Sequence, residues 1–215
     1  VNPDGLYVQG YTVSSLAADG TITLGSIENI NVPGESTTPP QATTTFTLDI
    51  NLDAGAAVND TYSSTQTIYD SFGNAIPLTL TFTKTAANAW IANVSVPTGT
   101  VSDPTTDIGI TNANITFDGN GNLLLPGTDP SITLTNLANG AAGIAINWDL
   151  FDSAGAANGD LTQYAAASTT NFNTQNGYAA GNLRGISVDE KGFVTGVYSN
   201  GQLSPLYQVV LAEFP

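Results

Sequence analysis

Residues 46–52 read Phe46-Thr47-Leu48-Asp49-Ile50-Asn51-Leu52, with apolar and polar side chains in strict alternation. Successive side chains of a β-strand point to opposite faces, so a period of two gathers the apolar residues on one face. The pattern therefore predicts a strand of an antiparallel sheet, with one face buried and the other in water.

The same alternation recurs along the chain. It is present at residues 76–82, 90–96, 132–134 and 144–150, where every second side chain is apolar or aromatic. No segment combines a convincing 3.6-residue period with helix caps. We therefore expect an all-β fold.

Turn signals separate these predicted strands. In four places an apolar or aromatic residue is followed by Asp-x-x-Gly, in which Asp can accept backbone N–H groups and Gly can adopt a positive φ. The four turns begin at Asp70, Asp118, Asp152 and Asp189. We expect each of them to close a β-hairpin.

Two stretches with weak structural signals divide the chain, one at Val32–Pro40 and one between residues 153 and 170. Neither flank outside them is long enough to bury a core by itself, so we expect the two flanks to fold together around an insertion. We assign residues 1–38 and 162–215 to a discontinuous base β-domain. Residues 39–161 form the inserted outer β-domain in this prediction, of a barrel-like or sandwich-like kind.

The charge balance is strongly acidic, with 18 Asp and Glu against three bases and a formal net charge of −15. Nucleic acids are bound through clustered Lys and Arg, so we expect no nucleic-acid partner. An anionic membrane surface would repel the chain, and no apolar run approaches the roughly 18 residues of a membrane helix. We therefore expect no membrane partner.

The chain contains no Cys, His or Met. Disulfides and the common Cys–His or Ser–His nucleophiles are therefore excluded, and no carboxylate pair can be recognised from spacing alone. We expect no enzyme activity, no catalytic or metal-binding residues and no cofactor, and we assign no subunit-interface residues. The start at Val1 without Met indicates part of a longer chain.

Two features have both a functional and a structural interpretation. Asp118–Asn122 places oxygen ligands at alternate positions, as in a calcium loop, but the expected sixth-position Gly is Leu123 and the twelfth residue is Asp129. A hairpin turn is favoured, and ion binding there stays open. Trp90 and Trp148 resemble a sugar-stacking platform, although their place in alternating strands favours core positions.

Three stretches together resemble the bacterial flagellar hook protein family. Residues 2–11 (Asn-Pro-Asp-Gly-Leu-Tyr-Val-Gln-Gly-Tyr) are similar to the entry into the base domain, and residues 176–183 (Asn-Gly-Tyr-Ala-Ala-Gly-Asn-Leu) to the return into it. The closing run 209–214 also resembles the family. Distal rod proteins share these flanks, but residues 46–52 followed by 67–74 resemble the domain inserted in hook proteins.

The resemblance implies a structural subunit of the hook, a flexible extracellular tube of the flagellum that transmits torque from the motor and rod to the filament. It implies other copies of the same protein as partners in a helical tube, together with rod, hook-cap and hook–filament junction proteins. It also implies export without a cleaved signal peptide. The terminal helical regions that drive polymerisation in the family are missing, so we expect this fragment to be monomeric.

Two other functions stay open on sequence alone. An extracellular β-sandwich binding module, carbohydrate-binding or adhesin-like, has the same β-rich and acidic character. A glycosidase is the third hypothesis, and it requires a carboxylate pair that the sequence does not reveal.

Overall fold

The computed structural model describes residues 5–17, 20–32 and 36–210. Parts of the stretches that carry the family resemblance, and part of the predicted weak stretch at Val32–Pro40, lie outside the described residues; these parts are residues 2–4, 211–214 and 33–35. The described residues form strands, turns and bends and no helix, which confirms the all-β prediction, and so they include no helix able to span a membrane. The strands are β1 (Gln9–Leu16), β2 (Ile22–Asn29), β3 (Thr37–Thr38), β4 (Thr45–Asn51), β5 (Thr61–Tyr69), β6 (Ala75–Ala86), β7 (Ala89–Ser95), β8 (Ile108–Ile110), β9 (Asn114–Phe117), β10 (Leu123–Leu125), β11 (Ser131–Leu134), β12 (Ile144–Trp148), β13 (Leu161–Thr162), β14 (Thr169–Gln175), β15 (Gly181–Val188), β16 (Phe193–Tyr198) and β17 (Leu203–Val209).

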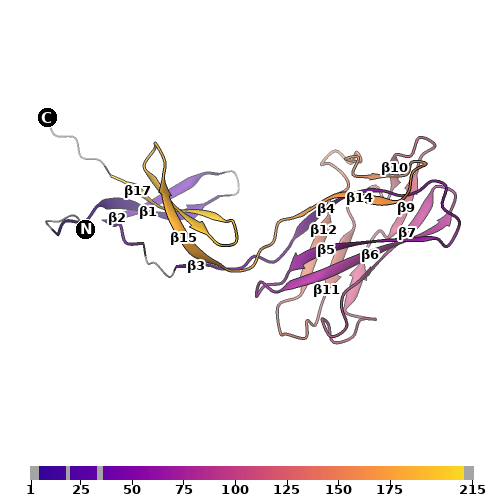
Figure 1. Cartoon of the computed structure of the whole chain (residues 1–215), viewed down its shortest axis with the longest axis horizontal. Coiled ribbons are helices and arrows are strands. Elements are labelled where there is room, and N and C mark those ends of the chain that lie inside the picture. The colour runs from indigo at the N-terminus through magenta and orange to yellow at the C-terminus, as the bar shows by residue number, and fades with distance from the viewer. Residues whose placement is uncertain (1–4, 18–19, 33–35, 211–215) are drawn as a thin grey trace. The chain divides into compact units, whose positions relative to one another are not determined.

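The chain divides into two compact units. Unit 1 comprises the residues up to Pro39 and those from Ala180 onward, and unit 2 comprises Pro40–Ala179. Unit 1 is a six-stranded sheet in the order β2-β1-β17-β16-β15-β3 (Figure 1). Strand β1 pairs with β17 in antiparallel register, Gly10 opposite Val209, so the two ends of the described chain complete one sheet.

Unit 2 contains two sheets. One has the order β10-β9-β7-β6-β5, and the other has the order β13-β4-β12-β11-β8 with β14 also paired to β4. Most neighbours are antiparallel, but β4 runs parallel to both β12 and β13. Figure 1 shows the strands of both sheets gathered in this unit.

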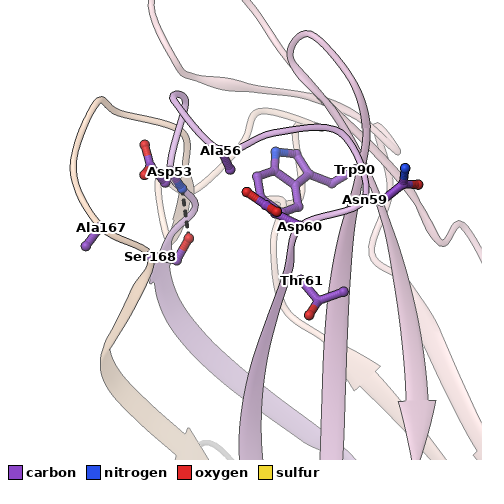
Figure 2. A pocket seen from close by; sticks show the side chains of 8 residues that line it. All are labelled: Asp53, Ala56, Asn59, Asp60, Thr61, Trp90, Ala167 and Ser168. Carbon is purple, nitrogen blue, oxygen red and sulfur yellow. Dashed lines mark hydrogen bonds between the residues drawn. The ribbon is translucent and has the colours of Figure 1, made fainter.

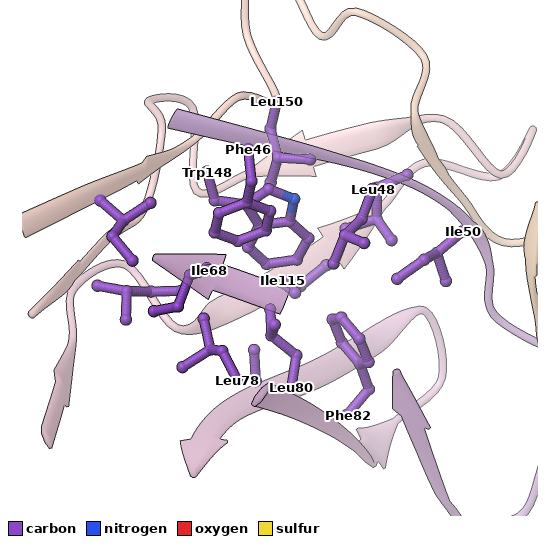
Figure 3. Packing of buried hydrophobic residues seen from close by; sticks show 14 of the residues in the cluster. Phe46, Leu48, Ile50, Ile68, Leu78, Leu80, Phe82, Ile115, Trp148 and Leu150 are labelled. Atoms are coloured by element: carbon purple, nitrogen blue, oxygen red, sulfur yellow. The ribbon is translucent and has the colours of Figure 1, made fainter. Parts of the chain in front are cut away.

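The hydrophobic core lies in unit 2, between the inward positions that the period-two patterns predict. Trp148 is stacked on Phe46 with ring centroids 6.0 Å apart, and the rings of Phe82 and Trp148 are inclined at 60° with centroids 5.8 Å apart (Figure 3). Each fully buried aromatic or large aliphatic side chain contributes about 1.5–3 kcal/mol by leaving water. The strand residues with no exposed surface include Leu48, Ile50, Ile68, Leu78, Leu80, Phe82, Ile115, Ile132, Leu134, Ile146 and Trp148.

Three of the Asp-x-x-Gly sequences, those at Asp70, Asp118 and Asp189, join paired antiparallel strands as expected. The Asp152 sequence reverses the chain around the single bridge between Phe151 and Ala157 and closes no hairpin of two strands. All four form the same tight turn. In each, a carboxylate oxygen of Asp accepts the backbone N–H groups two and four residues later, at 2.8–2.9 Å. The fourth-position glycines, Gly73, Gly121, Gly155 and Gly192, all have φ between +80° and +84°. Local turn chemistry was therefore predicted correctly.

The second boundary between the units differs from the expected position at residue 162. Residues 162–179 lie in unit 2, because β14 pairs with β4 over Phe46–Asn51 and β13 pairs with the end of the same strand. The stretch 165–170, expected to be weakly structured, includes the start of β14. Pairing with β4 orders these residues although their own sequence has little apolar pattern.

Candidate functional site

The turn at Asp118 uses its carboxylate to hold the hairpin. One oxygen accepts the backbone N–H groups of Asn120 and Asn122, both at 2.8 Å, and the other accepts the Asn122 side-chain amide at 3.1 Å. These bonds, led by that from the Asn122 backbone, lower the pKa of Asp118 below its usual value. The carboxylate that would be the first ligand of a calcium loop is therefore engaged with the turn itself. The part of the chain that the structure describes contains no cluster of three or more metal-ligating side chains.

The two tryptophans are core residues. Trp90 is 2% exposed, and its indole N–H donates to Gln163 Oε1 at 2.7 Å. Trp148 has no exposed surface and is stacked against Phe46 (Figure 3). Stacking on a sugar requires an open ring face, so neither residue forms the platform of a carbohydrate-binding module. The core interpretation is confirmed.

An open depression of 480 Å³ lies at one end of unit 2, beside the loop after β4 and the starts of β5 and β14. Figure 2 shows Asp53, Asp60 and Ser168 around it, with the buried Trp90 behind. The Asp60 carboxylate accepts the Ala57 N–H at 2.8 Å, and the Asp53 N–H donates to Ser168 Oγ at 2.9 Å. These hydrogen bonds fix the loop after β4. The partner of the Ser168 hydroxyl is a backbone N–H group, which cannot act as a general base toward it.

Unit 1 has a different character, because much of its apolar surface stays in contact with water. Val194 and Tyr198, 4% and 5% exposed, are the buried large apolar residues among the described positions of this unit. Large exposed apolar areas are typical of interaction surfaces. The apolar residues of unit 1 that are at least 38% exposed are Leu6, Tyr7, Val8, Leu16, Leu24, Ile27, Ile186, Val188 and Leu203.

Two of the hollows that lie against this sheet are lined in part by apolar residues of its strands. One, of 260 Å³, is lined by Val188, Gly192 and Val209 together with the turn that joins β15 to β16. The other, of 730 Å³, is lined by Tyr7, Ile30 and Tyr207 with neighbouring polar residues. Among the described residues, backbone hydrogen bonds between strands hold the sheet of unit 1 together, while many of its apolar side chains stay exposed.

Comparison with known proteins identifies the family. The family model described as "Flagellar basal body protein FlaE D2 domain" matches residues 31–178. This chain belongs to that family. The match of the FlaE D2 domain covers nearly all of unit 2 (Pro40–Ala179).

The relatives of this FlaE D2 family member are flagellar hook proteins. The chain is 30% identical to the flagellar hook protein FlgE of Treponema pallidum over 255 residues, covering all of this chain and 55% of that protein. It is 31% identical to that of Escherichia coli over 227 residues, covering all of this chain and 52% of the relative. The chain therefore spans about half the length of these relatives. The resemblance to a central part of hook proteins is confirmed.

A solved structure shares the fold. The crystal structure of Helicobacter pylori flagellar hook protein FlgE2 matches with a TM-score of 0.61 at 13% identity, over 97% of this chain and 77% of that one. At this identity the likeness concerns the fold alone, and it agrees with the all-β architecture.

Sequence reasoning did not reveal the exposed apolar surface of the FlaE D2 family member. Ile186 and Val188 alternate with polar residues as buried strands do. Cross-strand partners lie on the same face, which places Val188 beside the buried Val194, yet Val188 is 59% exposed. A signal was available in the length of the flanks, since neither is long enough to bury a core by itself.

Proposed function

We propose that this chain is the central part of a structural subunit of the bacterial flagellar hook. The observation that carries the proposal is the alignment of the whole chain with hook proteins of several bacteria. Unit 1 is then the base domain, and unit 2 is the outer domain inserted in it. In this proposal the chain acts by holding shape under load and is not an enzyme.

The partners in this proposal are other copies of the full-length protein in a helical tube, and the rod, hook-cap and junction proteins at its two ends. The location is extracellular, in the flagellum, after export without a cleaved signal peptide. Torque transmission requires rigid domains, and the close-packed core makes unit 2 rigid. The exposed apolar surface of unit 1 supports contact with neighbouring subunits in the assembled tube.

Immunogold labelling of flagella tests the proposal. Antibodies raised against the purified chain are expected to label the short curved segment between the cell body and the filament. Label along the filament, or over the cell surface of a strain that lacks flagella, would contradict the assignment.

A solution measurement tests the state of the chain by itself. Sedimentation velocity is expected to give a single monomeric species, because the resemblance assigns polymerisation to helical regions and the described residues form no helix. Tubes assembled from this chain alone would overturn that part of the proposal.

A further inference from the structure

The outward side of the first sheet of unit 2 carries hydroxyl groups in a regular array. Residues of β5, β6 and β7 alternate between the core and this side, and the inward positions such as Leu80 and Phe82 are fully buried. The outward orientation of the intervening residues is therefore fixed. We call this array the hydroxyl face, and it consists of Thr61, Ser63, Thr65 and Thr67 on β5, Thr79, Thr81 and Thr83 on β6, and Asn93 and Ser95 on β7. Two apolar residues, Pro77 opposite Thr67 and Ile91 opposite Thr83, lie on the same side.

The array follows the strand register across three strands. Ser63 lies opposite Thr81, which in turn lies opposite Asn93, and Thr65 is aligned in the same way with Thr79 and Ser95. The hydroxyls of Ser63 and Thr81 are 3.0 Å apart, and those of Thr65 and Thr79 are 2.9 Å apart. Because these four hydroxyls bond to one another in pairs, their bonds stay in place when another surface covers the face.

The hydroxyl face carries no formal charge, although the chain has a net charge of −15. The lysine of β6, Lys84, points inward and is 4% exposed. The other sheet of unit 2 differs, because Asp49, Asp149 and Asp160 lie close enough around β4 to interact. Burial and then the charges of Asp49 and Asp149 raise the pKa of Asp160.

Two copies of so acidic a chain repel each other wherever their carboxylates meet, and like charges brought together at an interface are unfavourable. A charge-free face removes this obstacle. We propose that the hydroxyl face is the surface through which unit 2 contacts a second copy of this chain in the assembled polymer. This inference rests on the proposed function, and it adds the residues that make the contact.

The size of the face sets the strength of the contact. With about 3.4 Å per residue along β5 and about 4.8 Å between strands, the three strands offer roughly 30 by 14 Å, or about 400 Å². A stable pairwise interface needs about 800 Å² from each partner. One such contact is too weak to hold a dimer, whereas many of them repeated along a tube act together. The isolated chain stays monomeric, and the contact forms only in the polymer.

Cysteine accessibility tests this assignment, since the chain contains no cysteine of its own. Ser63→Cys and Ser95→Cys place a thiol on the hydroxyl face by the smallest available change. Thr133→Cys is the matched control, because Thr133 is an exposed residue of β11 in the other sheet. Each variant is made in the full-length protein, which is purified and polymerised, so that copies of the same protein are the only available cover.

The readout is the rate of maleimide labelling in the polymer relative to the monomer. We expect the rate to fall about tenfold or more at Ser63→Cys and Ser95→Cys, and to change less than about twofold at Thr133→Cys. Tubes in which the face cysteines react as fast as in the monomer would overturn the inference while leaving the hook role intact. Failure of the unsubstituted protein to form tubes would overturn both.

A charge variant supplies a second, independent readout. The double substitution of Thr65→Glu and Thr81→Glu brings carboxylates into the proposed contact, so the protein concentration needed for polymerisation is expected to rise and to fall back in high salt. Thr133→Glu adds a charge outside the contact and is expected to leave the protein concentration needed for polymerisation unchanged. An equal effect of the two changes would contradict the assignment.

Discussion

Lys84 is buried in unit 2 with its ammonium group satisfied by backbone oxygens. The Nζ atom donates to the Ala54 carbonyl at 2.6 Å and lies 5.4 Å from the centre of the Trp90 ring. Replacing it by Met keeps the apolar stem but leaves the carbonyl without its donor, so Lys84→Met is expected to cost about 1–3 kcal/mol of stability. Urea unfolding followed by tryptophan fluorescence measures the loss.

Lys191 provides the control for this substitution. Its side chain is exposed in the turn between β15 and β16, and surface changes of this kind normally stay within about 0.5 kcal/mol. A loss at Lys191→Met as large as that at Lys84→Met would show that charge, and not the buried contact with the loop after β4, is responsible.

Asp160 has a pKa above its usual value, because burial and the neighbouring Asp49 and Asp149 disfavour its charged form. The folded state then holds the proton more tightly than the unfolded chain, and the stability this gives is lost as pH rises through the folded-state pKa. At neutral pH the ionised Asp160 carboxylate therefore destabilises the folded state. Asp160→Asn is expected to stabilise unit 2 by about 0.5 kcal/mol at pH 7. The stability gain of the Asp160→Asn variant should disappear below about pH 3.5, where the carboxyl group of the unfolded chain is also protonated. Unfolding curves at both pH values check the sign, and a gain independent of pH would contradict it.

The Asp-x-x-Gly turns share one sequence signature but differ in how far their hydrogen bonds reach. Asp70 has no exposed surface and also accepts the side-chain amide of Asn139 at 2.6 Å, which joins two distant loops. The carboxylate of Asp152 serves only its own turn. Asp70→Ala is expected to cost about 3 kcal/mol and Asp152→Ala about 1 kcal/mol, since charged hydrogen bonds contribute about 1.5–3 kcal/mol when buried and less when exposed. Thermal unfolding of the two variants, at equal pH, measures the difference, and equal losses would contradict a role for the Asn139 bond.

The elements that sequence predicts are those whose signal is local. The alternating apolar residues of β4, β6 and β12 identify strands, and the Asp-x-x-Gly turns identify where hairpins reverse. Strand β14 could not be recognised in this way, because Phe172 is its single large apolar residue and is 59% exposed. Its place beside β4, more than 100 residues earlier in the chain, depends on non-local pairing that no local pattern encodes. The contact surfaces likewise depend on which faces stay uncovered, and coverage is a property of the whole fold.

At the scale of the molecule, the two units divide the apolar core unequally. Every residue of the hydrophobic core cluster lies in unit 2. Unit 1 has a complete backbone ladder, yet little of its apolar surface leaves water. Because apolar burial is the main favourable contribution to folding, unit 1 by itself is the less stable part. In the polymer proposed above, neighbouring subunits that cover these exposed side chains would add the missing burial.

This difference predicts that the units unfold at different denaturant concentrations. Both tryptophans, Trp90 and Trp148, lie in unit 2, so fluorescence reports on that unit, whereas far-ultraviolet circular dichroism reports on the strands of both. We expect the circular dichroism signal to begin its change at a lower urea concentration than the fluorescence signal, because separate cooperative units give non-coincident transitions. Residues 40–179 produced alone should keep the fluorescence midpoint of the whole chain. Coincident transitions in the whole chain, together with a lower midpoint for residues 40–179, would mean instead that the two units fold as one and that unit 1 does not depend on its neighbours for stability.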